Sequence, residues 1–488
     1  MTEALPWRER ALVLVVAVVV VLSPTLALAD SFAEVQEILA QCQAAYHRLV
    51  DYRGTLRHEV REGGPAARQD LIDATFRKPA FLSLRWQTGL YKGTTLLARP
   101  AWNRGNLLIK LGDWFDYLTL SVPPTEVGEP FVPGLKDVSE WLTALTALAQ
   151  RPAWDRSLRQ IETRTTDPNL AEGQVLLSVP AFLIPFRDNT VSSYDFVIER
   201  GTGVPMELVL RGGGGEVRQR LTYTDLQVNV GVPAQAFEWE DNAQGFRTLP
   251  RGEADIDLRG FIQNWQRRYA EIADYTGVWA TEERRGEWMT RSRAAFKFRK
   301  PFDVYLAWAA DGGGAREALF RQGWNDGRVR VRTALLGIPL IGDLAPDGYL
   351  ARRGYHYPLT EFGLNRLVER LQEQLLREWL QGELEVRFRG VQDYEGHPCY
   401  VIEYQFPHSQ GREPSAARVV TYWDVAQRVP VKYEAYDWAD RLDERHEFRQ
   451  LRLNVSLSDA DFDAANPAYG FLLFRHAPRL DRFFTGRE

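Results

Sequence analysis

Apolar and charged positions alternate with a period of two in two stretches of this chain. In the later stretch a series of apolar residues sits at even positions, while Lys297, Arg299 and Asp303 sit at odd positions. The apolar residues are Phe296, Phe298, Phe302, Val304, Leu306 and Trp308, and the earlier stretch keeps the same parity with Phe76, Leu82, Leu84 and Trp86. Successive side chains of a strand point to opposite faces, so both stretches predict a sheet with one apolar face. The Lys-Pro pair inside each stretch predicts a bend or bulge between two strands, because proline cannot donate to the ladder.

Helical spacing precedes each alternating stretch and returns once within each half. Apolar residues recur at this spacing over 35–49, 258–272, 138–150 and 359–381. The first helix of each half is followed by Asp-Tyr-x-Gly, in which the glycine is expected to provide the helix stop. Each half is therefore predicted to be a helix, an antiparallel meander, an inserted helix and a returning meander. A long sheet with one apolar face is expected to curl around its helices.

The two halves repeat each other at an offset of about 222 to 225 positions. Phe76-Arg77-Lys78-Pro79 recurs as Phe298-Arg299-Lys300-Pro301, and the Asp-Tyr-x-Gly and Asn-Val pairs recur in the same order. A period of this length indicates two whole domains rather than short stacked repeats. The predicted organisation is a signal peptide over 1–29, a first domain over 30–246, a linker over 247–257, a second domain over 258–475 and a C-terminal tail over 476–488.

The first residues have the pattern of an export signal. Arg8 and Arg10 precede an apolar run, and Ala27-Leu28-Ala29 forms a small-x-small cleavage site. A retained membrane anchor is the alternative, but the apolar run is shorter than the roughly 20 residues that span a bilayer. Cleavage would leave Asp30, not a lipid-attachment cysteine, at the N-terminus. We therefore expect an exported, periplasmic protein that is soluble after cleavage.

The net charge indicates which partners the chain can bind, and the cysteine content indicates whether disulfides stabilise its fold. The formal net charge of −5 gives no electrostatic footprint for nucleic acid. Cys42 and Cys399 are the only cysteines and fall in different predicted domains. A bridge between them is conceivable after export, but the apolar content of 45% predicts that packed cores hold the framework.

The sequence contains no recognised catalytic or metal-binding signature. Gly212 to Gly215 lies between two strand-like runs without a following Lys-Ser/Thr, so a hairpin turn is expected instead of a phosphate loop. Asp461-x-Asp463 begins like a calcium loop but lacks the next ligand and the glycine, which favours a strand-end turn. His356 could serve as an acid–base residue in a cleft, although a packed loop histidine is the simpler interpretation. We expect no enzymatic activity, no metal and no cofactor.

The apolar sheet face allows two interpretations. It can be ordinary core beneath the helices, which is what periodicity most simply indicates. Alternatively, it can line a concave groove that stays partly open and admits acyl chains. Periodicity does not distinguish a filled interior from a hollow one.

Several motifs of the second half resemble an exported bacterial family, domain of unknown function 1571, which is similar to the outer-membrane lipoprotein-sorting proteins LolA and LolB. The motifs are Tyr275-x-Gly277, Glu282-Glu283-Arg284, Phe298-Arg299-Lys300-Pro301-Phe302-x-Val304-Tyr305-Leu306, Tyr357-Pro358-Leu359-x-Glu361-x-Gly363-Leu364 and Phe462-x-x-x-Asn466-Pro467-x-Tyr469. The first half is a weaker copy, with Ser83 in place of Tyr305. The resemblance implies an α+β fold of two tandem LolA-like domains, each a curved antiparallel β half-barrel wrapped around helices. It also implies a concave apolar face that holds acyl chains in carriers of this class.

The leading hypothesis is a non-enzymatic envelope protein that binds a lipid or the acyl chain of a lipoprotein, with an envelope membrane or protein as a further partner. The candidate lining residues are Phe296, Phe298, Val304, Leu306 and Trp308, with Phe76, Leu82, Leu84 and Trp86 in the weaker copy. Burial of each methylene contributes about 0.8 kcal/mol. The alternative is an envelope scaffold or interaction protein with filled cores. An enzyme acting on envelope lipid or peptidoglycan through the His356 region is a third hypothesis.

Overall fold

The described part of the chain forms two compact units. The computed structural model describes residues 32–473 apart from 62–66, 101, 153, 166–167, 169, 185, 187–189, 239–253, 309–315, 336–337, 349–357, 380–383 and 407–415. Among these residues, the first unit contains 32–113, 122–127 and 131–238, and the second contains 114–121, 128–130 and 254–473. The range 30–246 predicted for the first domain thus includes a short segment that packs in the second unit. The expected signal peptide, C-terminal tail and His356 lie outside the described residues, as does most of the expected linker.

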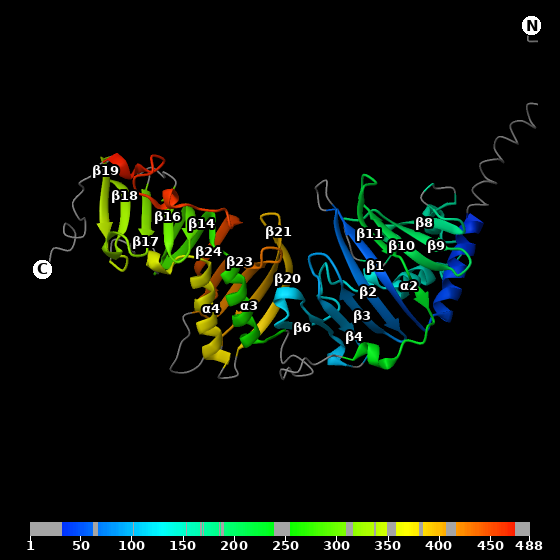
Figure 1. Ribbon diagram of the computed structural model, residues 1–488. Coiled ribbons are helices and arrows are strands. Elements are labelled where there is room, and N and C mark those ends of the chain that lie inside the picture. The colour runs from blue at the N-terminus through cyan, green and yellow to red at the C-terminus, as the bar shows by residue number, and fades with distance from the viewer. Residues whose placement is uncertain are drawn as a thin grey trace, which may run out of the picture. The chain divides into compact units, whose positions relative to one another are not determined.

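The first unit is an antiparallel sheet with helices (Figure 1). A helix covers residues 32–48, and α2 covers Val138–Ala149, close to the expected 138–150. The strands are β1 (Asp51–Val60), β2 (Arg68–Arg77), β3 (Phe81–Trp86), β4 (Thr95–Ala98), β5 (Leu107–Lys110), β7 (Glu162–Arg164), β8 (Gln174–Pro180), β9 (Ser193–Glu199), β10 (Val204–Arg211), β11 (Val217–Tyr223) and β12 (Gln227–Val228). Pairing runs β7-β8-β9-β10-β11-β1-β2-β3-β4-β5, and β12 also pairs with β1. The inserted helix α2 packs against β10.

The second unit repeats this plan with longer strands. Its strands are β6 (Leu118–Val122), β13 (Ala254–Ile256), β14 (Asp274–Arg285), β15 (Trp288–Arg299), β16 (Asp303–Trp308), β17 (Arg316–Arg321), β18 (Val329–Leu335), β19 (Ile338–Leu344), β20 (Glu385–Tyr394), β21 (His397–Gln405), β22 (Arg418–Asp424), β23 (Val429–Tyr436) and β24 (Leu442–Leu453). Pairing runs β6-β13-β20-β21-β22-β23-β24-β14-β15-β16-β17-β18-β19. The helices α3 (Leu258–Glu271) and α4 (Leu364–Trp379) lie side by side (Figure 1), and α4 contacts β23. Two antiparallel sheets served by few helices confirm the predicted α+β class.

Gly363 explains why the predicted helix over 359–381 is interrupted. A short 3-10 helix, η8 (Leu359–Glu361), precedes α4, and Gly363 between them has a φ of 113°. A Cβ at this position would lie 2.5 Å from the Tyr275 hydroxyl oxygen. That hydroxyl oxygen accepts a hydrogen bond from the backbone N–H of Leu364 at 3.0 Å. The glycine therefore allows the start of α4 to approach β14 closely.

The glycines of the two Asp-Tyr-x-Gly signals lie within strands, so the prediction that they stop helices is wrong. Gly54 is in β1 and Gly277 is in β14. A Cβ on Gly54 would lie 3.1 Å from the Leu226 Cα, and one on Gly277 would lie 2.7 Å from the Arg449 carbonyl oxygen. Gly54 thus lets the chain between β11 and β12 approach β1 closely, and Gly277 lets β24 approach β14.

The phenylalanine, arginine and lysine of the repeated Phe-Arg-Lys-Pro motif make specific contacts. In the second unit the Phe298 ring stacks on Tyr275 with centroids 4.7 Å apart, and the Lys300 ammonium donates to the Tyr269 carbonyl oxygen at the end of α3. In the first unit Lys78 donates to the Tyr46 carbonyl oxygen at 2.6 Å. The Lys-Pro pairs lie in the turns between β2 and β3 and between β15 and β16, as the sequence predicts. The motif thus fastens the first helix of each unit to its sheet.

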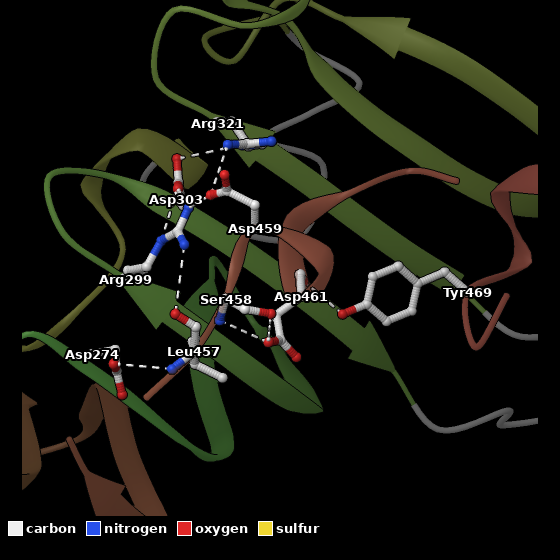
Figure 2. A network of polar contacts seen from close by, with 9 residues as sticks. All are labelled: Asp274, Arg299, Asp303, Arg321, Leu457, Ser458, Asp459, Asp461 and Tyr469. Carbon is white, nitrogen blue, oxygen red and sulfur yellow. Dashed lines mark hydrogen bonds and ion pairs between the residues drawn. The ribbon is translucent and has the colours of Figure 1, made fainter. Parts of the chain in front are cut away.

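The arginine of the motif fastens the segment after β24 (Figure 2). The Arg299 guanidinium contacts the carboxylates of Asp303 and Asp459, each at 2.7 Å. Asp274, from the Asp-Tyr-x-Gly signal, accepts from the Leu457 N–H at 3.1 Å. The Tyr469 hydroxyl donates to the Asp461 carbonyl oxygen at 2.6 Å. These contacts anchor η9 (Asp459–Phe462) to the strands, so Asp461 belongs to a 3-10 helix that follows the strand.

The face of β16 and β17 opposite the apolar face is also covered, by the segment that follows β24. Tyr305 and Leu319 point away from the apolar face and are buried, and Tyr305 stacks on Tyr469 with centroids 3.9 Å apart. The cluster consists of Tyr305, Leu319, Ile341, Phe462, Tyr469 and Phe471. The odd positions are therefore only partly the charged face that alternation predicts, because the C-terminal segment packs over them.

Several smaller predictions concern turns, cysteines and membrane spans. Gly212 to Gly215 form the turn between β10 and β11, which confirms the predicted hairpin. Cys42 and Cys399 are both buried with free thiols. No helix within the described residues is long and apolar enough to cross a membrane.

Candidate functional site

A cavity of about 110 Å³ lies in the second unit between its sheet and the beginning of α4. The sheet contributes apolar side chains from strands β14, β16, β17, β18, β19 and β24, and the η8–α4 segment closes the other side. The apolar lining includes Leu306, Ala318, Val329, Val331, Leu344, Leu359, Phe362, Leu367 and Phe448. The wall is therefore mainly hydrocarbon.

Two of the five residues predicted to line a groove in this unit border the cavity, namely Leu306 and Trp308. Phe296 and Phe298 are buried at 2% exposure each, and both rings pack against Phe362, with centroids 5.4 and 6.3 Å from it. Since Phe362 borders the cavity, these two rings lie behind its wall. Val304 is fully buried in β16.

The four corresponding residues of the first unit are packed in its core. Phe76, Leu82, Leu84 and Trp86 are all buried, at 3%, 5%, 0% and 1% exposure. The Trp86 ring meets Phe131 edge-on with centroids 5.5 Å apart. Phe131 comes from the segment before α2 and occupies the space beside Trp86.

Trp308, the counterpart of Trp86, is only half-buried. Its indole N–H donates to the Ser292 hydroxyl at 2.9 Å, which orients the ring. The Arg316 guanidinium carbon lies 4.4 Å from the ring centroid, in a cation–π contact across the β16–β17 pair. Arg316 also borders the cavity, so Trp308 and Arg316 together form one end of its wall.

Trp279, Glu283 and His446 add polar groups to the β14–β24 side of the cavity. The His446 imidazole is parallel to the Trp279 ring, with centroids 6.0 Å apart. Its Nε2 lies 3.4 Å from a carboxylate oxygen of Glu444. Glu283 pairs across the strands with Glu444 and is buried at 1% exposure. An otherwise apolar wall therefore contains carboxylates and one histidine.

Arg370 and Glu361 form an ion pair at the helical side of the cavity. The Arg370 guanidinium lies 3.3 Å from the Glu361 carboxylate and donates to the Glu361 carbonyl oxygen at the same distance. The pair ties the first turns of α4 to η8, and both residues border the cavity.

The described lining of the cavity combines apolar side chains with the carboxylates of Glu283 and Glu361 and the imidazole of His446. Among the described residues, no group of three or more histidine, cysteine, aspartate or glutamate side chains could hold a metal ion. The geometry thus offers apolar contact together with two arginines and two glutamates.

Sequence reasoning missed the lining residues that come from outside the β15–β16 pair. Trp279 and Phe448 lie on neighbouring strands, and Phe362 and Arg370 come from the segment at the start of α4. A usable signal existed for Phe362 and Leu367, which belong to the apolar face of the helix predicted over 359–381.

Comparison with proteins of known structure finds distant similarities. A LolA superfamily protein from Nitrosomonas europaea is 11% identical over 41% of this chain and 96% of its own, with a TM-score of 0.18. The Mycobacterium tuberculosis lipoprotein LppX is 10% identical over 42% of this chain and 98% of its own, with a TM-score of 0.26. A structure of the Pseudomonas aeruginosa MucA/MucB complex matches with 12% identity over 63% of this chain and 91% of its own, with a TM-score of 0.23. Similarities at this level assign no function.

The sequence comparisons are more specific about the second half. No curated protein matches the chain in sequence. The model of a family described as "Protein of unknown function (DUF1571)" matches residues 272–471, a range that contains α4 and all the strands bordering the cavity. Both units have the predicted plan of an antiparallel sheet served by few helices. Similarity to the DUF1571 family therefore covers residues 272–471, within the second half of the chain.

Proposed function

We propose that this chain is a non-enzymatic, exported protein of the bacterial cell envelope whose second unit binds an acyl chain of a lipid or lipoprotein. The single observation that carries the proposal is the cavity of about 110 Å³ between the sheet and α4. Its lining is mainly apolar, and burial of apolar surface is the principal driving force for holding a hydrocarbon chain. The two arginines and two glutamates of the wall balance in formal charge, so apolar contact is the main recognition element.

The size of the cavity limits what it can hold. An apolar cavity of about 150 Å³ takes up benzene, and pockets for drug-sized ligands measure about 300–1,000 Å³. The cavity of this unit therefore suits the end of an acyl chain, not a whole lipid. Burial of about four to six methylenes would contribute roughly 3–5 kcal/mol, which alone corresponds to affinity in the millimolar range.

Filling the cavity tests the proposal. Ala318 is buried at 4% exposure on β17 and borders the cavity, so Ala318→Leu would place three additional carbons in it. We expect at least a tenfold loss of affinity for a fluorescent fatty-acid probe, measured by titration of the purified full chain. The matched control is Ala295→Leu, which adds the same atoms at an exposed position of β15 and should leave probe affinity unchanged. Unaltered probe binding by Ala318→Leu would contradict the proposal, as would an absence of co-purifying lipid in mass spectrometry of the protein from envelope extracts.

The first unit supports a second candidate function, that of an envelope scaffold or interaction domain with a filled core. The observation behind it is the close packing of Phe76, Leu84 and Trp86, with Phe131 placed against Trp86. A membrane or a protein of the envelope would then be its partner. A truncation that abolishes an envelope interaction while probe binding persists would assign the two functions to different units.

A further inference from the structure

Residues 114–121, which we call the inserted segment, belong by sequence to the first half of the chain but pack in the second unit. The segment contains part of η2 (Asp113–Phe115) and most of β6. Trp114, Phe115 and Tyr117 are buried at 7%, 3% and 2% exposure, and Leu118 and Leu120 are completely buried. Burial this complete identifies the segment as part of a core and not as a surface loop.

Three aromatic side chains of the inserted segment fill a groove made by the second half. The Phe115 ring meets Tyr400 of β21 edge-on with centroids 4.6 Å apart. The Trp114 ring lies 5.6 Å from Trp423 of β22, and the Tyr117 ring lies 5.2 Å from Phe261 of α3. Pairs with these separations and angles are favourable aromatic contacts.

Asn264 of α3 forms hydrogen bonds with the inserted segment. Its side-chain amide donates to the Trp114 carbonyl oxygen at 2.7 Å and to the Asp116 carboxylate at 3.0 Å. In return the Trp114 indole N–H donates to the Asn264 carbonyl oxygen at 2.8 Å. Asn264 is 2% exposed, so loss of these partners would leave a buried amide unsatisfied, which is costly.

The segment also extends the sheet of the second unit. Leu118 pairs with Ile256 and Leu120 with Ala254 in antiparallel register, and Ala254 in turn pairs with Val386 of β20. By position in the repeat, β6 corresponds to β19, which pairs with β18 of its own unit. An extended segment that adds a strand to a sheet edge and places side chains in pockets is a recurrent mode of peptide recognition.

We propose that the inserted segment is an internal ligand by which the first half of the chain docks on the second. The second unit then contains, besides the cavity, a recognition groove for an extended aromatic segment, bordered by α3, β13 and β20–β22. The main-chain pairing supplies affinity, and the aromatic side chains and Asn264 supply specificity. This inference is independent of lipid binding, because none of the cavity residues takes part in these contacts.

Cleavage of the chain tests the docking directly. A specific protease site placed between residues 245 and 246 leaves the inserted segment on the N-terminal fragment and its partners on the C-terminal fragment. After complete cleavage of the purified full chain, we expect the fragments to remain together as a one-to-one complex in size-exclusion chromatography and native mass spectrometry. Separation of the two folded fragments at micromolar concentration would overturn the proposal.

A charge introduced in the groove tests whether the inserted segment, and not another contact, holds the two fragments together. In the cleaved protein, Phe115→Asp should release the fragments, because it places a carboxylate against Tyr400. The control is Trp154→Asp, an aromatic-to-acid change at an 83% exposed position of the first half, which should leave the complex intact. The milder Phe115→Ala should raise the dissociation rate at least tenfold and keeps the test valid if Phe115→Asp does not fold. Equal association of Phe115→Ala and the unsubstituted protein would overturn the proposal.

Discussion

The interiors of the two units differ, although their strands pair in the same order from the first strand after the initial helix. Leu84 of β3 faces Leu96 of β4, whereas Leu306 of β16 faces Ala318 of β17 at the corresponding position. Leu96 is completely buried, and Ala318 borders the cavity. The second unit therefore has a smaller side chain, at the border of its cavity, where the first unit has a buried leucine in the same register.

The segment before the inserted helix reinforces this difference. In the first unit Phe131 packs against both Trp86 and Tyr91, with centroids 5.5 Å from each. In the second unit Phe362 precedes α4, but it packs toward Phe296 and Phe448 and leaves Trp308 half-buried. The same sheet position is therefore covered by an aromatic ring in one unit and exposed to a cavity in the other.

Polar groups inside the two units are also placed differently. His58 of β1 faces Leu221, whereas at the corresponding pair Thr281 faces His446. Burial, together with the nearby charge of Lys136, lowers the pKa of His58 to about 3, and a contact with Gln219 opposes this shift. Before α2, Asp137 accepts from the Tyr52 hydroxyl at 2.8 Å, while Gly363 occupies the place before α4. The interior of the first unit thus contains two buried titratable groups, His58 and Asp137, at these positions.

The largest expected effect comes from converting the first interior to the pattern of the second. Leu96→Ala removes a fully buried side chain and should destabilise the first unit by about 2–5 kcal/mol, because the transfer energy is lost and a cavity remains. Chemical denaturation measures this loss. Acquisition of fatty-acid probe binding by the variant would show that residue size alone separates the two units. A loss below about 1 kcal/mol would mean that the neighbouring side chains collapse into the space.

A smaller effect is expected from His58. Since its pKa is lowered to about 3 in the folded state, the unfolded chain takes up the proton first as the pH falls. The stability that this group contributes is therefore fully present above its ordinary pKa of 6.5 and is lost as the pH falls from 6.5 to about 3. His58→Leu should reduce the acid destabilisation of the first unit by roughly 2–4 kcal/mol at pH 4. The measurement is urea denaturation at pH 4 and pH 7.5, with His47→Leu at an exposed position as control; the same pH dependence in both variants would contradict this expectation.

The smallest effect concerns Asp137. Burial raises its pKa from 3.8 to about 6, against the opposing effect of hydrogen bonds from Ser139 and Tyr52. The folded state therefore holds the proton more tightly, and the associated stability is present below pH 3.8 and falls as the pH rises to about 6. Asp137→Asn keeps an acceptor for the Ser139 N–H. Relative to the unsubstituted protein, its free energy of unfolding should increase by about 1–2 kcal/mol as the pH rises from 4 to 7. A constant difference across this range, measured by thermal or urea unfolding, would contradict the assignment.

Much of the fold follows from local pattern. The alternation around Phe298 and Leu306 defines the buried sheet face, because strand side chains alternate by geometry. The helical spacing over 138–150 matches α2 nearly to the residue. The repeated Phe-Arg-Lys-Pro and Asp-Tyr motifs identify two similar units, since the lysine of each copy fastens the first helix of its unit to the sheet.

The candidate site depended on contacts that are distant in sequence. Leu306 and Trp308 were predicted from periodicity, but Ala318, Phe362 and Phe448 border the cavity only because three separate segments converge. Phe298 has the same parity as Leu306 and lies behind the wall instead.

The sequence by itself determined which side chains face inward and that the plan occurs twice, because strand and helix periods are local properties of the backbone. Only the tertiary structure decided which interior is filled, since this depends on whether Phe131 or Phe362 reaches the space beside a tryptophan. It also decided that residues 114–121 join the second unit. Hydrophobic burial is non-directional, so an apolar segment does not encode which of two similar sheets will receive it.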